Sequence, residues 1–257
     1  MSKMGSKTFL AFGDLHIPHH DPDAVQVILD VIHKVKPDLV VILGDMLNLS
    51  HFSNFRGIIQ EANEDYLQDV GLANKILDQV QRDSKKVVFL EGNHEARIDR
   101  WSAEHTAGRS MYSMIAPRHV LTRGRSSKFS YVPYFTDTQT YSHYKITPSL
   151  IAVHGWTWGK MATKRHLELA RGVSIIHGHS HRAQTEYGQL PFSLDPVEAR
   201  SAGCLCKKVE LRNVGSPKEW VHGFILGYWA SAKDFTMYTC VIRNGKVVLP
   251  SGETVYA

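Results

Sequence analysis

Short runs of apolar, often β-branched residues mark the predicted strands. They lie at Thr8–Phe12, Leu39–Leu43, Val87–Leu90, Leu150–Val153 and Val173–Ile176. None of them alternates between apolar and polar residues, which would be the pattern of a strand with one face in water. We therefore expect strands that are buried on both faces, as in a parallel sheet covered by helices.

Helical spacing appears between these runs. In Asp23–Val35 the apolar positions are Val27, Ile28, Val31, Ile32 and Val35, with Asp21 or Asp23 as a cap and Pro37 as a stop. Leu67–Val80 and Met161–Ala170 are further predicted helices. Strands that alternate with helices indicate an α/β fold with a largely parallel first sheet and right-handed crossovers.

The pattern changes after His181 to shorter β-like segments. Asn244-Gly245 separates Tyr238–Ile242 from Lys246–Leu249, which is the signature of a hairpin. We expect a second, more antiparallel sheet from residues 183–257, packed on the first. No linker divides the chain, so we predict a single domain over 1–257, with its motifs in 8–182 and an insertion at about 105–148.

Composition narrows the class of protein. The longest apolar runs are too short to span a bilayer, and the first seven residues are polar, so we expect no membrane association and a cytoplasmic location. Three cysteines fit a reducing compartment; Cys204 and Cys206 are either half of a metal site or, as we favour, ordinary strand residues. The net charge of +5 permits an acidic partner without identifying one.

Polar side chains follow the carboxyl end of every predicted strand. Because that end of a parallel sheet is where ligands bind, these side chains should converge in one crevice. The residues concerned are Asp14, His16, Asp45, Asn48, Asn93, His94, His154, His177, His179 and His181. Any one of these histidines alone could be a hydrogen-bonded core residue, but their shared position favours a metal site.

Asp, Asn and His without a thiolate suit Mn²⁺, Fe²⁺ or Zn²⁺ better than a soft ion. The ligands are too many for one ion, whereas two ions about 3.5–4 Å apart that share a carboxylate would use them all. With Asp14 and Asp45 as the only anionic ligands, two divalent ions leave the site positively charged. A phosphate ester is the substrate that such a site favours.

The motifs Asp14-Leu-His16, Gly44-Asp45, Gly92-Asn93-His94-Glu95, Val153-His154 and Gly178-His179-Ser-His181 resemble those of the calcineurin-like metallophosphoesterase family, over roughly residues 8–181. The resemblance implies a four-layer α/β/β/α sandwich and two ions, with Mn²⁺ favoured and Fe, Zn, Ni or Co as alternatives. It implies that Asp14, His16 and His181 hold the first ion, that Asn93, His154 and His179 hold the second, and that Asp45 bridges them. A bridging hydroxide would attack, Asn93 and His94 would contact the substrate, and His94 would also stabilise its charge and protonate the leaving group.

One departure from the family bears on the substrate. The protein Ser/Thr phosphatase branch continues the second motif with an aspartate that pairs with the motif histidine, then with a phosphate-binding arginine; here these positions hold Asn48 and Leu49. This argues against a dedicated protein phosphatase, and the Gly-His-Ser-His block resembles the nuclease, phosphodiesterase and small-phosphatase branches instead. Arg97 is a candidate substrate contact in place of the missing arginine, or else a solvated helix residue.

The predicted insertion is basic and aromatic. Residues 105–136 contain no acidic residue but hold Arg109, Arg118, Arg123, Arg125, Lys128, Tyr112, Phe129, Tyr131 and Tyr134. Such interleaving suits a nucleotide or a single strand of nucleic acid. A solvated basic loop over packing aromatics explains it equally well.

The first hypothesis is therefore a metal-dependent hydrolase of phosphate mono- or diesters, acting on nucleotides or nucleic acid. The alternatives are a broad phosphomonoesterase with protein or metabolite substrates, and a scaffold without catalysis. A scaffold should have lost ligands, and His94 above all. The apolar segment Trp220–Trp229 suits either the core or a subunit interface, so the sequence leaves the oligomeric state open.

Overall fold

The computed structural model describes residues 5–53, 65–136, 140–189, 195–207 and 219–257, so parts of the predicted insertion and of the C-terminal region lie outside it. A first sheet has the strand order β11-β10-β1-β2-β3-β4. Its four parallel strands are β1 (Lys7–Phe12), β2 (Leu39–Ile42), β3 (Val87–Leu90) and β4 (Phe129–Val132), and its antiparallel strands are β10 (Gly223–Trp229) and β11 (Phe235–Val241).

The second sheet has the order β5-β6-β7-β9-β8 and is mixed. Parallel pairing joins β6 (Leu150–Val153), β7 (Ser174–His177) and β9 (Pro196–Ala202), while β5 (Tyr144–Thr147) and β8 (Ala183–Gln189) are antiparallel edge strands. The predicted α/β class, with a largely parallel first sheet and a second sheet, is confirmed.

The assignment of strands to sheets differs from the prediction in two places. Strands β6 and β7 belong to the second sheet, whereas the C-terminal strands β10 and β11 extend the first. The reason is that β6 and β7 are covered on both faces, by the first sheet and by a helix, so their apolar runs match those of the first sheet.

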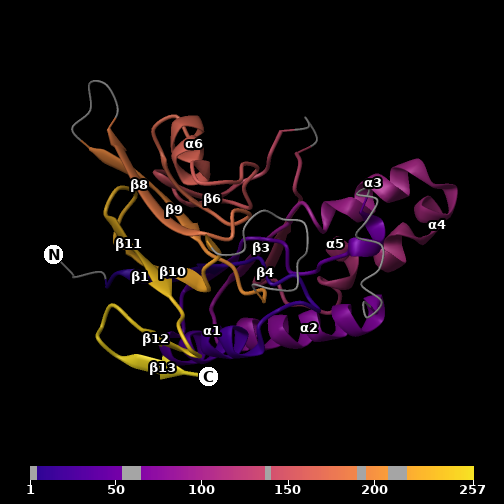
Figure 1. Ribbon diagram of the computed structural model, residues 1–257, viewed down its shortest axis with the longest axis horizontal. Coiled ribbons are helices and arrows are strands. Elements are labelled where there is room, and N and C mark those ends of the chain that lie inside the picture. The colour runs from indigo at the N-terminus through magenta and orange to yellow at the C-terminus, as the bar shows by residue number, and fades with distance from the viewer. Residues whose placement is uncertain (1–4, 54–64, 137–139, 190–194, 208–218) are drawn as a thin grey trace.

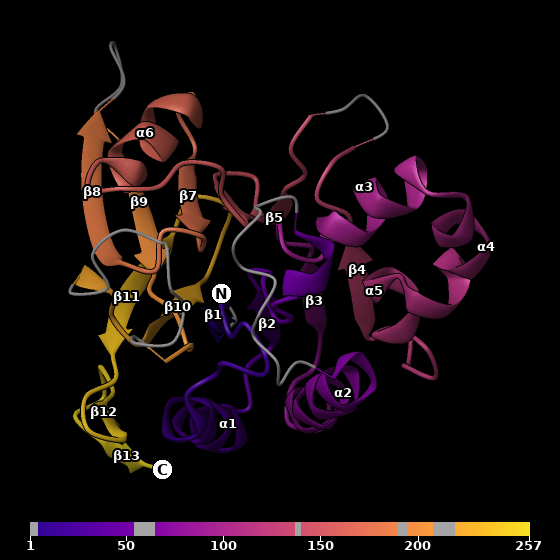
Figure 2. The same ribbon diagram turned by 45° about the vertical axis from the view of Figure 1, so that its right-hand side comes forward.

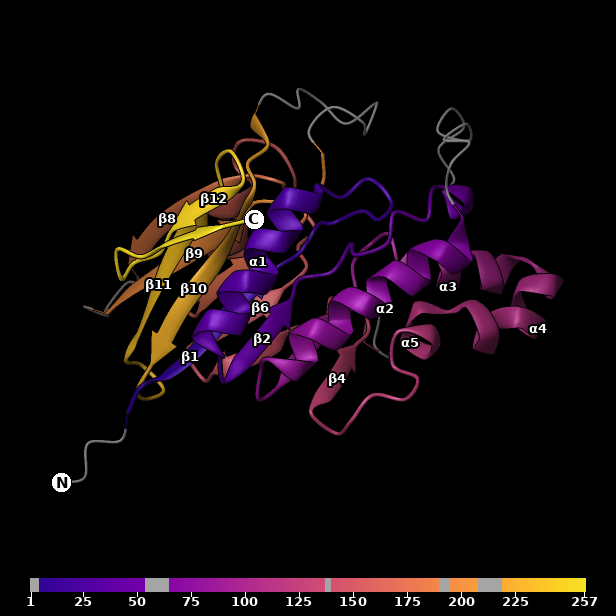
Figure 3. The same cartoon turned by 90° about the horizontal axis from the view of Figure 1, so that it is seen from below.

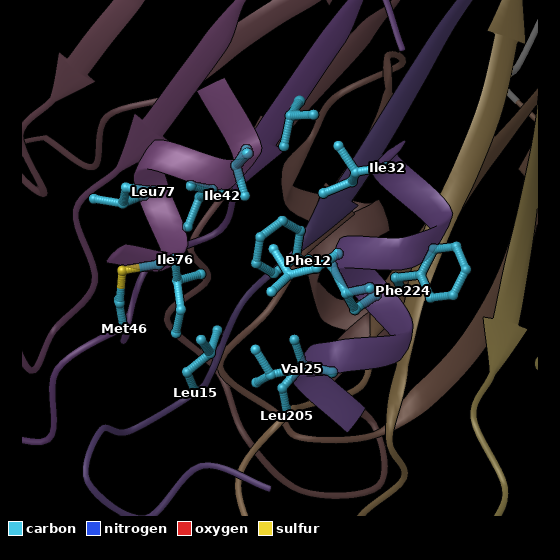
Figure 4. Packing of buried hydrophobic residues seen from close by; sticks show 14 of the residues in the cluster. Phe12, Leu15, Val25, Ile32, Ile42, Met46, Ile76, Leu77, Leu205 and Phe224 are labelled. Atoms are coloured by element: carbon cyan, nitrogen blue, oxygen red, sulfur yellow. The ribbon is translucent and has the colours of Figure 1, made fainter. Parts of the chain in front are cut away.

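Helices complete the four layers (Figures 1 and 2). Helices α1 (Pro22–Val35) and α2 (Tyr66–Arg82) lie on the outer face of the first sheet, and α6 (Ala162–Leu169) covers the second sheet. Phe12, Ile42 and Phe224 pack against Ile32 and Ile76 between the first sheet and its helices (Figure 4). Other apolar clusters fill the space between the sheets and the space beneath α6.

Local sequence signals set the ends of α1. The Asp21 side chain accepts a hydrogen bond from the Ala24 N–H, Pro22 occupies the first turn, and Lys36 ends the helix in the left-handed conformation. The predicted helices agree with α1, α2 and α6 to within a few residues.

The insertion contains more regular structure than its sequence indicates. After α3 (Ala96–Glu104) come α4 (Thr106–Ile115) and α5 (Pro117–Val120), which lie beside the first sheet (Figure 3), and then β4 and β5. Phe129 and Tyr131 of β4 pack into the α1–α2 side of the core. Arg118 pairs with Asp99, and Arg125 with Asp78, so these two cations stabilise the insertion itself.

The C-terminal region contains the predicted turn and a small two-stranded sheet. Asn244 and Gly245 both have positive φ and form the predicted turn, but β12 (Lys246–Val248) then pairs with β13 (Thr254–Tyr256) as a small separate sheet. Much of Trp220–Trp229 is core: Trp220, Phe224, Ile225 and Leu226 are buried.

A short helix, η1 (Ser50–Phe52), follows the second motif. No helix in the described ranges has both the length and the apolar character needed to cross a bilayer.

Candidate metal centre

The predicted ligands come together where strands of both sheets end. Asp14 and His16 follow β1, Asp45 follows β2 and Asn93 follows β3, all in the first sheet. His154 follows β6, and His179 and His181 follow β7, in the second sheet. The crevice is therefore shared by two packed sheets and is not the edge of one.

The backbone at these positions is strained. Asp14, His16, Asp45, His179 and His181 all have φ between 50° and 62°, in the left-handed region. Residues with a Cβ adopt this region at an energetic cost, and such residues concentrate at functional sites. The chain thus accepts strain to direct five of the seven predicted ligand side chains into one place.

Two glycines allow the loops to approach closely. A Cβ on Gly92 would lie 2.2 Å from Asp45 Oδ1, and one on Gly178 would lie 2.6 Å from Asp14 Oδ2. Neither position can hold a larger residue without displacing a predicted ligand.

Asp14, His16 and His181 form the first group. His181 Nε2 lies 3.3 Å from Asp14 Oδ1 and 3.1 Å from His16 Nε2. Asp14 also accepts hydrogen bonds from the backbone N–H of His179, at 3.1 and 3.0 Å. All three side chains are almost fully buried.

The second group is centred on His154, whose Nε2 lies 2.9 Å from Asn93 Oδ1. The His179 ring lies 5.1 Å from the His154 ring, and His179 is partly exposed. Asp45 lies between the groups, with Oδ2 at 3.8 Å from His16 Nε2 and 3.4 Å from His154 Nε2. This is the position that the sequence predicts for a bridging carboxylate.

The groups that contact the Nδ1 atoms fix the orientation of three of the histidine rings. His154 Nδ1 donates to the Leu43 carbonyl oxygen at 2.6 Å, so Nε2 of the neutral ring carries the lone pair. His181 Nδ1 faces Cys206 Sγ at 3.9 Å, and His16 Nδ1 faces Asn48 Oδ1 at 3.3 Å. The three Nε2 atoms therefore point inward, as metal-binding histidines do.

Charge and burial set the protonation of the centre. Burial favours the neutral carboxyl of Asp45, but His154 and His94 outweigh it and hold its pKa well below the usual range. Burial also disfavours a charged His154, yet Asp45 overcomes this and raises its pKa to about 9. Burial, then His94, lower the pKa of His16, and burial lowers that of His179 to about 3. His16 and His179 are therefore neutral beside an ionised Asp45, which is the form that binds a metal, whereas His154 beside Asp45 and His181 beside Asp14 have raised pKa values and would release a proton when an ion binds.

The donor set fits divalent ions. Two Nε2 atoms 3.1 Å apart, on rings whose Nδ1 atoms face other partners, repel each other unless a cation or a proton lies near. Three overlapping clusters of ligand atoms lie within 4.8 Å: His16, His181 and Cys206; His16, Asp45 and His94; and Asp45, His154 and His179. Cys206 was expected to be an ordinary strand residue, but it is a buried residue at an isolated bridge and contacts a predicted ligand.

His94 lies at the mouth of the centre, with 15% of its side chain exposed. Its Nδ1 donates to the Asn48 carbonyl oxygen at 2.6 Å, and its Nε2 accepts from the Arg97 guanidinium at 2.9 Å. Arg97 also donates to the Asn48 carbonyl at 2.9 Å and is in the first turn of α3. Burial lowers the pKa of His94 to about 4, and Asp45 opposes this shift. Asn48 thus orients His94 through its backbone, although it lacks a carboxylate.

Glu95 is a structural residue that the sequence analysis did not single out. Its buried carboxylate accepts hydrogen bonds from the backbone N–H groups of Asp45, Leu47 and Gly92, each at 2.9 Å. Burial, then Asp45, raise the pKa of Glu95 to about 8, against the effect of these donors. Its place in the Gly-Asn-His-Glu motif was the available signal.

His177 and His166 lie outside the centre. Their rings stack 4.0 Å apart between β7 and α6, and His177 Nε2 contacts Thr163 Oγ1 at 3.1 Å. The strand-end pattern predicted His177 in the crevice, but its ring turns toward α6 instead, and neither histidine is in the ligand set that the family resemblance implies.

Comparison with known proteins agrees with this fold. Structures that resemble the chain include vacuolar protein sorting 29 from Cryptosporidium parvum, with 11% identity, a TM-score of 0.50 and coverage of 98% of this chain and 97% of that chain. They also include a Vps29 single mutant from Entamoeba histolytica, with 15% identity, a TM-score of 0.49 and coverage of 97% and 99%. YfcE, a phosphoesterase from E. coli, has 11% identity, a TM-score of 0.41 and coverage of 92% and 100%. No curated protein matches the chain significantly in sequence.

The sequence model of the calcineurin-like phosphoesterases matches residues 7–183, which include every predicted ligand and His94. This match spans more than half of the 257 residues. The chain belongs to the calcineurin-like phosphoesterase family.

Proposed function

We propose that this protein is a dinuclear metal-dependent phosphoester hydrolase. The first ion would be held by Asp14, His16 and His181, the second by Asn93, His154 and His179, and both by Asp45. The observation that carries the proposal is the convergence of imidazole Nε2 atoms and carboxylate oxygens from two sheets, with the outer ring nitrogens facing other partners. The closest distances between these atoms are 3.1–3.8 Å.

Divalent ions held there would supply Lewis acidity and a nucleophile from water at neutral pH. Mn²⁺ is the favoured ion, with Fe, Zn, Ni or Co as alternatives, because the ligands are imidazoles, carboxylates and an amide. The three cysteines are buried and free, which fits a reducing compartment such as the cytoplasm.

Arg97 and His94 would act on the substrate as a pair. The Arg97 guanidinium carries a permanent positive charge and donates to His94 Nε2 at 2.9 Å, so it would turn to a bound phosphoryl oxygen as a strong charged donor and release Nε2. An anionic phosphate also raises the pKa of a neighbouring imidazole. His94 can then take up a proton and donate it to the leaving oxygen.

The substrates we favour are mono- or diesters of nucleotides or nucleic acid. A broad phosphomonoesterase that includes protein substrates is the alternative, although Asn48 and Leu49 do not provide the side chains of the protein phosphatase branch. A scaffold without catalysis would not need to keep His94 in contact with Arg97 beside a full set of seven ligand side chains. We therefore favour the enzyme.

The test combines metal reconstitution with a variant. Protein stripped with chelator should regain hydrolysis of nitrophenyl mono- or bis-esters on addition of Mn²⁺. His94→Ala should still bind two ions per chain but turn over roughly 10²–10⁴-fold more slowly. The matched control is His33→Ala, an exposed histidine on α1, which should leave turnover unchanged.

Two outcomes would contradict the proposal. Inactivity of the wild-type protein with every metal and with both ester classes would favour the scaffold. Full activity of His94→Ala would remove His94 from the mechanism.

A further inference from the structure

Aromatic side chains gather on one side of the candidate centre. Tyr134 and Phe135 follow β4, Tyr141 precedes β5, and Trp156 and Trp158 lie in the loop between β6 and α6. We call these five residues the aromatic rim. Trp158 is 74% exposed, Tyr141 43% and Phe135 39%. Scattered apolar residues are ordinary on protein surfaces, but a contiguous exposed group indicates a binding site.

The rim is continuous with the second group of ligands. The Tyr134 ring lies 5.8 Å from the His154 ring, and the Trp158 ring lies 6.4 Å from the His179 ring. A pocket lined in part by Tyr134, Tyr141, His154 and Trp156 adjoins these rings. A substrate that reaches the metal ligands therefore meets an aromatic surface next to them.

The base of this surface is rigid. Trp156 stacks on Tyr141 at 4.9 Å with an interplanar angle of 16°, and its backbone N–H donates to His166 Nε2 at 3.2 Å. Trp158 is two residues further along the same loop, where its ring stays largely in solvent. An exposed indole on a fixed loop offers a flat face for stacking at little conformational cost.

The ion pairs of nearby cations favour a substrate with one base over a long strand of nucleic acid. A long strand needs a track of cations for its backbone. Arg118 and Arg125 are engaged with Asp99 and Asp78, and Lys160 and Arg182 both pair with Glu219. Each of these four cations has a carboxylate partner, although Lys160 and Arg182 share one, and this favours a short ester over a polymer at the rim.

We infer that the aromatic rim, and Trp158 in particular, stacks the base of a nucleoside phosphate ester whose phosphate lies at the candidate metal centre. This inference rests on the proposed function. A sugar separates a nucleobase from its phosphate. This spacing suits the ring of Trp158, which lies beside the predicted metal ligands and not directly over them. In an aryl phosphate such as phosphotyrosine the ring is attached to the reacting phosphate itself.

The test compares two esters with the same leaving group, thymidine 5′-(4-nitrophenyl) phosphate and ethyl 4-nitrophenyl phosphate, on the Mn²⁺-loaded protein. Trp158→Ala should lower kcat/KM for the thymidine ester roughly 5- to 150-fold, the range of base stacking on an aromatic ring. The ethyl ester should change less than about twofold, because it has no base to stack and shares its nitrophenyl group with the thymidine ester. Trp158→Phe should keep most of the preference for the thymidine ester.

Tyr256→Ala is the matched control, since Tyr256 is 63% exposed but is on β13. It should change neither ester. An equal loss on both esters in Trp158→Ala, no loss on the thymidine ester, or a wild-type preference for phosphotyrosine over the thymidine ester would overturn the inference.

A binding measurement separates this inference from the proposed function. Calorimetry with thymidine monophosphate and with inorganic phosphate needs no turnover. If the wild-type protein hydrolyses neither of these diesters nor the monoester 4-nitrophenyl phosphate, the proposed function fails, but a preference for the nucleotide that Trp158→Ala abolishes would still support the rim. Equal affinities of the wild-type protein for the nucleotide and for phosphate would refute it.

Discussion

Glu95 connects two of the loops that carry ligand side chains. Its Oε2 accepts from the N–H groups of Asp45 and Gly92, and its Oε1 accepts from that of Leu47. A glutamine keeps one acceptor oxygen but turns an amide N–H₂ toward a backbone donor on the other side. The side chain is fully buried, so no water replaces the lost acceptor.

At pH 9, where Glu95 is ionised because its pKa is about 8, Glu95→Gln should therefore lower the free energy of unfolding of the metal-free protein by about 2 kcal/mol. It should also weaken Mn²⁺ binding by about 10–100-fold, as loss of an outer partner of a metal site does. Urea unfolding in chelator and calorimetric Mn²⁺ titration measure the two effects. Glu104→Gln, an exposed change at the end of α3, is the control. Wild-type Mn²⁺ affinity in Glu95→Gln would show that the loops hold their geometry without this carboxylate.

The ligand side chains were predictable because their residue types repeat at strand ends. The contacts that orient His94 were not, because the Asn48 group involved is a backbone carbonyl, which every residue type provides. Cys206 was considered only as half of a cysteine metal site, and its contact with His181 was not predicted, because it joins residues 25 apart in the chain with no motif to link them. Arg97 was predictable as a candidate from its place in the first turn of a helix.

At the scale of elements, α6 packs on the second sheet through a pair of buried histidines. His166 Nδ1 donates to the Ala162 carbonyl at 2.8 Å, and Nε2 accepts from the Trp156 N–H at 3.2 Å. Both bonds use the neutral ring, and burial lowers the pKa of His166 to about 4. An unfolded histidine has a pKa of about 6.5.

Because the unfolded state binds the proton more tightly, this contribution to stability is complete above pH 6.5 and is lost as the pH falls toward 4. The loss is on the order of 2–3 kcal/mol. His166→Gln should therefore show a shallower fall in the free energy of unfolding between pH 6.5 and 4.5, measured by urea unfolding in chelator. His143→Gln, an exposed histidine, should behave like the wild-type protein. Parallel curves for His166→Gln and the wild-type protein would contradict the role of His166.

The positions of the strands were predicted better than the sheets to which they belong. The runs at Val87–Leu90 and Leu150–Val153 coincide with strands, because four consecutive apolar residues are a sufficient signal. The sheet to which each strand belongs depends on what covers it, and the sequence of the strand does not encode that. Strand β4 was missed because Phe129-Ser-Tyr-Val132 is short, partly polar and only half buried.

At the scale of the whole molecule, the candidate centre joins the two sheets. Its predicted ligands follow β1, β2 and β3 on one side and β6 and β7 on the other, above an apolar cluster that packs Phe9, Val41 and Val88 against Leu150 and Ile176. The apolar layer fixes the distance between the sheets without any ion. Ions at the rim of this layer would add a second connection between them.

Metal binding should therefore stabilise the folded chain as a unit. The unfolded chain has no preformed site, so Mn²⁺ at 100 times its dissociation constant should add about 2.7 kcal/mol for each ion. For a chain of this size each kcal/mol corresponds to about 2–4 °C in Tm, so thermal unfolding should shift by about 5–10 °C per ion. Asp45→Asn should reduce the shift, because both groups of ligands lose their shared carboxylate, whereas Asp78→Asn, an exposed carboxylate on α2, should keep it. Hydrogen exchange should slow together at the ends of β2 and β6 in wild-type protein with Mn²⁺. Slower exchange in one sheet alone, or an undiminished shift in Asp45→Asn, would mean that the ions do not connect the sheets.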